Sequence, residues 1–183
     1  MKKIRFFLEK IYSESIIHCV YNNFITGFAR MNDYKEINSI IGEWDGKLLH
    51  YAEQFLLNRD AAQNVVQNVF VQYIRYRREH DGERINPGVW LLRAVRNACR
   101  KEQHGAMVFL SFPFPVPGGS DEVCAMRQKI SSLDAADQEL LFLHFSEKKR
   151  YEEIAEITGN NLPATAKLIA AAVQRLNDLG GVA

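Results

Sequence analysis

The amino-acid sequence predicts an all-α fold in which a Pro-rich linker joins two small helical domains. Its 183 residues, 47% of them hydrophobic and 25% charged, are enough for one medium domain or two small ones. Apolar residues recur at helical spacing along most of the chain. Residues 105–120 interrupt this pattern with alternating prolines and two successive glycines, which favours two domains over one.

Residues 1–32 are expected to be an N-terminal extension. The basic and apolar start, residues 2–8, is typical of a signal peptide, but Glu9, Lys10 and Glu14 break the apolar run too early for one. The run is also far shorter than the roughly 20 apolar residues that span a bilayer, so no membrane insertion is expected. We hypothesise that translation starts naturally at Met31, which mass spectrometry of the protein from its own host would test.

Residues 33–104 are predicted to form the first domain from three helices. The first carries apolar residues at helical spacing from Ile37 to Leu56. Asp60, with Gln63 three residues later, is the expected N-cap of a second helix that runs to about Arg78. Pro87 suits the first turn of a third helix. The residues expected to face the core are Val65, Val66, Val69, Phe70 and Tyr73 of the second helix, and Val89, Leu92, Val95 and Cys99 of the third.

The linker, residues 105–120, has an extended Pro-rich pattern. Phe109, Phe112 and Phe114 make it too apolar for a freely solvated connection. A surface of this protein or of a partner is therefore expected to cover them.

Residues 121–183 are predicted to form a helix-turn-helix domain. Helices are expected from near Asp121, from Asp134 to about Phe145, over 151–158 and over 162–179. Between the last two, Gly159 is expected in the left-handed conformation that ends a helix, and Asn161 is expected to cap the next one.

Composition and motifs give no support to an enzyme. Three widely spaced cysteines and five scattered histidines show no metal-ligand spacing, and neither a phosphate-binding loop nor a nucleophile elbow is present. We therefore expect no catalytic residue, no metal and no cofactor, and the cysteine usage fits a reducing cytoplasm. The net charge is only +1, but residues 75–101 hold eight basic and three acidic residues, whereas residues 134–158 hold three basic and seven acidic. Such an uneven distribution is compatible with a positive face that binds nucleic acid.

Two stretches, in this order along the chain, resemble bacterial RNA polymerase sigma factors of the extracytoplasmic-function subgroup. Residues 60–70 (DAAQNVVQNVF), followed by residues 90–97 (WLLRAVRN), resemble the segment that binds polymerase and melts the promoter. Residues 151–159 (YEEIAEITG) resemble the start of the promoter-reading helix-turn-helix. The resemblance runs from about Asp33 to Leu179.

In the first domain the resemblance implies two surfaces. One would dock on core polymerase through Asn64, Gln67, Asn68 and Val71. Amides stand there where relatives commonly have carboxylates, which removes the charge assistance that roughly doubles a hydrogen bond's strength. The other would bind the downstream promoter element and the melted strand through Arg77, Arg78, His80, Asp81, Arg93, Arg96, Asn97, Arg100 and Lys101. From the residues alone, the first surface is most simply a solvated polar face, and a solubilising basic face is the alternative for the second. Trp90 is expected to be a packing residue.

In the second domain the resemblance implies contacts with the upstream promoter element. The matching residues are Lys148, Lys149, Arg150, Asn161, Ala164, Thr165, Lys167, Leu168 and Arg175. Alanine and leucine offer base edges little beyond contact with a thymine methyl, so specific reading by the last helix is in question. The basic triplet 148–150 is expected to compensate by gripping phosphates, or else to be a solvated turn.

The resemblance implies a cytoplasmic transcription initiation factor whose partners are core RNA polymerase, promoter DNA and an anti-sigma protein. Two alternatives stay open. One is a degenerate sigma-like module that engages polymerase or an anti-sigma protein without reading promoters. The other is a helix-turn-helix repressor, which as a dimer would require a palindromic operator.

Overall fold

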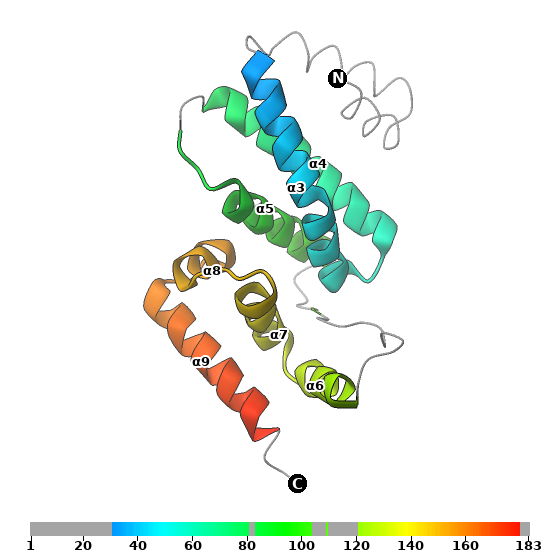
Figure 1. The fold of residues 1–183 in the computed structure, drawn as a ribbon, viewed down its shortest axis with the longest axis vertical. Helices are drawn as coiled ribbons and strands as arrows, with labels where there is room; N and C mark the ends of the chain where they lie inside the picture. Colours follow the sequence, from blue (N-terminus) through cyan, green and yellow to red (C-terminus); the bar gives the residue numbers. More distant parts are fainter. Residues whose placement is uncertain (1–30, 81–82, 104–108, 110–120, 180–183) are drawn as a thin grey trace.

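The computed structural model describes residues 31–80, 83–103, 109 and 121–179. Those residues form seven α-helices and one short π-helical segment, with no strand among them, so the predicted all-α class is confirmed (Figure 1). The expectations for the N-terminal extension fall on residues outside the described ranges, apart from Met31 and Asn32 at the start of helix α3.

The first half, residues 31–103, consists of α3 (Met31–Leu56), α4 (Arg59–Glu79) and α5 (Pro87–Glu102), which pack on one another. The predicted inward residues of α4 and α5 are all buried. Pro87 occupies the first turn of α5, as predicted. Before it, the side-chain oxygen of Asn86 accepts hydrogen bonds from the N–H groups of Gly88 and Val89 at 3.1 and 3.4 Å.

The cap of α4 differs from the prediction. Its N-cap is Asn58, whose side-chain oxygen accepts a hydrogen bond from the N–H of Ala61 at 3.0 Å. Asp60 lies instead inside the first turn. Both residues have suitable oxygen acceptors, but Asn58 is the one with an extended backbone, which the N-cap position requires. The negative charge of Asp60 still favours the helix, because it lies near the positive end of the helix dipole.

The second half, residues 121–179, consists of α6 (Asp121–Ser131), α7 (Ala135–Leu141), η1 (Phe142–Ser146), α8 (Tyr151–Thr158) and α9 (Leu162–Asp178). Asp134 caps α7 by accepting a hydrogen bond from Asp137 N–H at 2.8 Å, and the π-helical η1 continues it. Gly159 has φ of 78°, the predicted left-handed conformation. Asn161 caps α9 through the N–H of Ala164 at 2.8 Å, also as predicted.

One continuous buried cluster includes residues from both halves. It contains Tyr51 and Phe55 of α3 together with Phe142 and Leu143 of η1. Helix α5 lies beside α8 (Figure 1). Phe109 from the predicted linker is 1% exposed and lies against Tyr51, Phe55 and Phe142, at ring-centroid distances of 4.9 to 6.0 Å. The protein's own surface therefore covers this phenylalanine, whereas Phe112 and Phe114 lie outside the described residues.

Candidate nucleic-acid interface

The four residues expected to contact polymerase lie together on the outer side of α4. Asn64 and Asn68 are exposed, and Gln67 and Val71 are half-buried. They share one side because residues three and four apart on a helix are neighbours. Val65, Val66 and Val69, which lie between them in sequence, are buried, so these four residues point away from the core. The first half therefore has a neutral, amide-rich surface there.

At the C-terminal end of α4, the residues expected to line a base pocket have partners within the protein. Arg77 lies 3.1 Å from Glu36 of α3, as an ion pair. The His80 ring stacks on Tyr76 with centroids 4.2 Å apart, and its Nδ1 is 3.0 Å from the Tyr76 carbonyl oxygen. The hydroxyl of Tyr76 donates to Glu83 at 2.8 Å, which raises the pKa of that tyrosine. Arg78 is exposed, and Asp81 lies outside the described residues.

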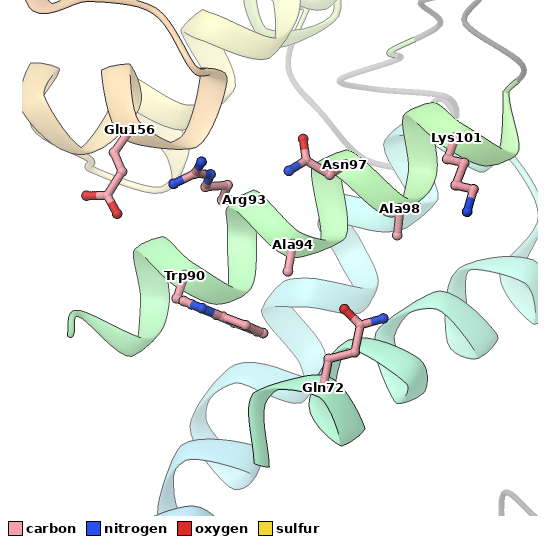
Figure 2. A pocket seen from close by; sticks show the side chains of 8 residues that line it. All are labelled: Gln72, Trp90, Arg93, Ala94, Asn97, Ala98, Lys101 and Glu156. Carbon is pink, nitrogen blue, oxygen red and sulfur yellow. The ribbon is translucent and has the colours of Figure 1, made fainter. Parts of the chain in front are cut away.

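A hollow of about 430 Å³ opens beside α5 and brings three of the predicted residues together. Arg93, Asn97 and Lys101 follow one another at four-residue intervals, so they share one side of the helix (Figure 2). The hollow is completed by Ala94 and Ala98 of α5, Trp90 of α5, Gln72 of α4 and Glu156 of α8. Sequence reasoning missed Gln72 and Glu156 as lining residues, because both read as ordinary solvated positions of their helices.

Trp90 belongs both to the packing of the first half and to the wall of this hollow. Its ring meets Tyr73 edge-on with centroids 5.3 Å apart, and it lies 5.5 Å from the ring of Tyr76. The side chain is half-buried. These contacts hold the indole in place while part of it faces the hollow, where Gln72 lies opposite (Figure 2).

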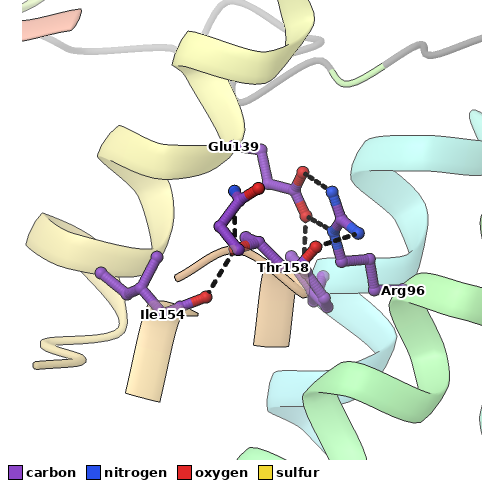
Figure 3. Close-up of polar contacts among 6 residues, drawn as sticks. Arg96, Glu139, Ile154 and Thr158 are labelled. Atoms are coloured by element: carbon purple, nitrogen blue, oxygen red, sulfur yellow. Dashed lines mark hydrogen bonds and ion pairs between the residues drawn. The ribbon is translucent and has the colours of Figure 1, made fainter. Parts of the chain in front are cut away.

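The expectation that Arg96 is exposed is wrong. Arg96 is 7% exposed and pairs with Glu139 of α7, with Nε to Oε1 at 2.7 Å and Nη2 to Oε2 at 3.1 Å (Figure 3). Burial lowers the pKa of the Arg96 guanidinium, but hydrogen bonding and the charge of Glu139 outweigh burial and raise it. Arg96 therefore lies inside the contact between the halves, whereas Arg93, Asn97, Arg100 and Lys101 remain exposed.

The three basic residues before α8, residues 148–150, lie in different environments. Lys148 is exposed and has a φ of 51°, in the left-handed region. Lys149 is half-buried, with its Nζ 4.8 Å from the ring centroid of Trp44, a cation–π contact. Arg150 is exposed at the N-cap of α8, and its backbone N–H donates to Glu153 at 2.9 Å. Lys148 and Arg150 are thus accessible to phosphate, whereas Lys149 contacts Trp44 of the first half.

On α9, two of the residues expected to contact DNA form hydrogen bonds within the protein. Thr165 is completely buried and its hydroxyl donates to the Asn161 carbonyl oxygen at 3.0 Å, so the expectation that it faces DNA is wrong. Arg175 is partly exposed but forms two hydrogen bonds with the buried carboxylate of Asp137, which raise its pKa. Lys167 and Leu168 are exposed and Ala164 is half-buried. Lys167 is the cation of α9 that this half leaves available.

Among residues 31–80, 83–103, 109 and 121–179, no group of three or more histidine, cysteine or acidic side chains is arranged to hold a metal ion. No helix in the described part of the chain combines the length and apolar character that crossing a membrane requires.

The fold is similar to that of a solved sigma factor. The chain matches the structure of the sigma factor RpoE in complex with the anti-sigma factor NepR from Bartonella quintana with a TM-score of 0.57 and 18% sequence identity. The match covers 84% of this chain and 99% of that one. No family model and no curated protein sequence matches the chain. At this identity the likeness shows a shared fold.

Proposed function

We propose that this chain is a sigma-type transcription initiation factor, without catalysis of its own, that acts in the cytoplasm by bringing core RNA polymerase to a class of promoters. The observation that carries the proposal is the hollow beside α5, with its tryptophan, two cations and two amides, on a chain that has a sigma-factor fold. The first and second halves would be its two functional domains.

The hollow has the chemistry that holding an unpaired base requires. Extruding a base from a duplex costs a few kcal/mol, and stacking on an aromatic ring stabilises the extruded base by about 1 to 3 kcal/mol. Trp90 supplies the ring, and the amides of Asn97 and Gln72 can bond to base edges. Arg93 and Lys101 supply cations that can bind the strand's phosphates.

The amide surface of α4 is suitably placed for polymerase. Asn68 lies one helical turn before Gln72, which lines the hollow, so the two surfaces are adjacent on the first half. A protein bound to Asn64, Gln67, Asn68 and Val71 would thus lie beside the opened strand. In the second half, α8, the turn at Gly159 and α9 would act as a helix-turn-helix at the upstream element, with Lys148, Arg150 and Lys167 on phosphates.

A second candidate is a sigma-like module that binds polymerase or an anti-sigma protein but reads no promoter. Several DNA-facing residues of the sigma pattern are unavailable in this structure, since Arg96 and Thr165 are buried and Arg175 is paired with Asp137. The solved RpoE is itself in complex with an anti-sigma factor, which supports an anti-sigma partner in both proposals.

Run-off transcription with purified core polymerase on genomic fragments separates the candidates. Initiation at discrete sites is expected, and Arg93→Ala should reduce it about tenfold, because a well-made contact with DNA contributes on the order of 1 to 3 kcal/mol. Arg59→Ala is the matched control, since Arg59 is an exposed arginine of α4 about 20 Å along the helix from Gln72. Polymerase binding without initiation would favour the module. Failure to bind polymerase would exclude the sigma function and leave the module only as a partner of an anti-sigma protein.

A further inference from the structure

Arg96 and Glu139 form a buried ion pair that exists only while the two halves are in contact. Glu139 is 1% exposed, and its hydrogen-bond partners in Figure 3 come from outside its own helix. Arg96 donates to both of its oxygens, and the hydroxyl of Tyr51 in α3 donates to Oε1 at 2.7 Å. Arg96 Nη1 also donates to the Thr158 carbonyl oxygen of α8 at 3.3 Å. The first half thus satisfies a carboxylate that the second half provides.

Two further carboxylates of the second half, Glu153 and Glu156, also face the first half. Basic residues predominate in residues 75–101 and acidic residues in residues 134–158, and these two segments face each other through α5 and α8. Glu156 of α8 lines the same hollow as Arg93, and Glu153 of α8 accepts a hydrogen bond from Asn86 at 3.0 Å. Glu139 and Glu156 of the second half therefore lie beside α5, the helix on which the proposed DNA contacts depend.

A carboxylate and a phosphate are alternative partners for the same guanidinium group. Each accepts two parallel hydrogen bonds from arginine. We propose that Glu139, assisted by Glu156, is an internal substitute for nucleic-acid phosphate on α5, so that the closed arrangement weakens strand binding. This inference rests on the proposed function, because it assigns a regulation to the same strand-binding surface.

The physical chemistry of a buried ion pair makes it suitable for such a switch. The cost of removing both charges from water largely cancels their attraction, so the pair specifies how the halves meet without holding them tightly. When the halves separate, both charges regain their hydration and Arg96 becomes exposed on α5. A ligand that binds the open state more tightly then shifts the population toward it, and the closed state lowers the apparent affinity for that ligand.

The first measurement is the distance between the halves. Spin labels are placed at exposed positions, Ser39→Cys on α3 and Asn177→Cys on α9, with Cys19 and Cys124 changed to serine. Electron–electron double resonance should give one narrow distribution for the parent, and a longer, broader one for Glu139→Gln. Asp137→Asn is the matched control, since it neutralises a buried carboxylate whose partner, Arg175, belongs to the same half.

A second variant covers the case in which Glu139→Gln does not fold. Glu139→Asp has a shorter side chain that cannot reach Arg96 with both oxygens, so it should also lengthen the distance. Unchanged distances in the folded variants would overturn the proposal.

The second measurement is binding of a fluorescent single-stranded oligonucleotide, followed by anisotropy at low salt. Glu139→Gln should bind at least about fivefold more tightly than the parent, the lower end of typical coupling between two sites. Glu152→Gln removes an exposed carboxylate of α8 that has no part in the contact, and it controls for the general change in charge. Equal affinities for Glu139→Gln and Glu152→Gln would overturn the proposal. An opened variant with the expected affinity, but without run-off transcription, would uphold the switch and reject the sigma function.

Discussion

Gly88 lies where the first turn of α5 meets the indole ring of Trp44. A Cβ atom at this position would overlap Cζ2 and Cη2 of the ring. Trp44 cannot easily move away, because it is 8% exposed and has the ammonium groups of Lys47 and Lys149 within 4.8 Å of its ring centroid. The close approach of α3 to α5 therefore depends on the absence of a side chain at Gly88.

Gly88→Ala should lower the free energy of unfolding by about 1 to 3 kcal/mol, the usual cost of overpacking a core. Urea unfolding followed by tryptophan fluorescence measures this directly. Gly46→Ala provides the control, since it lies on the exposed side of α3 with nothing near its Cβ direction. There, alanine should stabilise by up to about 1 kcal/mol through its better helix propensity. A loss of stability in both variants would contradict the packing explanation.

At the scale of single elements, two residues at the start of α4, Asn58 and Asp60, have side chains suited to an N-cap. Asn58 accepts the N–H of Ala61, whereas Asp60 lies in the first turn and acts only through its charge. Asn58→Ala should therefore cost about 1 kcal/mol of stability, as loss of an N-cap does. Asp60→Asn removes only the charge and should cost about 0.3 to 1 kcal/mol at low salt, falling as salt is added. Thermal unfolding at low and high salt measures both, and a salt-dependent loss in Asn58→Ala would contradict this assignment.

Most elements could be predicted because their signals are local. The spacing of Val65, Val69 and Tyr73 indicates the buried side of α4, and Gly159 indicates a helix end in the left-handed conformation. Neither prediction requires knowledge of the rest of the fold. The positions of Arg96 and Thr165 could not be predicted in this way. Arg96 lies at the edge of the apolar side of α5, and whether such a position is buried depends on α7, 43 residues away in sequence. Glu139 is the residue that could have indicated this. It directly precedes the apolar run 140–143, and a carboxylate buried with such a run requires a polar partner.

At the scale of the whole molecule, the buried cluster that the two halves share includes two weak acids, Cys99 and Tyr51. Burial, with a smaller effect of Glu102 and Glu139, raises the pKa of the Cys99 thiol from 9.0 to about 12. Burial and then Glu139 raise the pKa of the Tyr51 hydroxyl well above 10.0. Both groups are neutral when protonated, and both lose the proton more readily in the unfolded chain. The stability that they contribute is therefore complete at neutral pH and is lost as the pH rises.

For Cys99, this loss begins near pH 9, where the unfolded thiol ionises, and continues to about pH 12. Between roughly pH 8 and pH 10 the thiol alone should lower the free energy of unfolding by about 1 kcal/mol, and Tyr51 adds to the decline at higher pH. Urea unfolding across this range should show a shallower decline for Cys99→Ala than for the parent, although the alanine variant starts from a lower stability because of the cavity it creates. Cys124→Ala, at an exposed position of α6, should keep the parent's slope. Parallel curves for Cys99→Ala and the parent would mean that the thiol ionises in the folded protein as readily as in the unfolded chain, and that the core around α5 admits water.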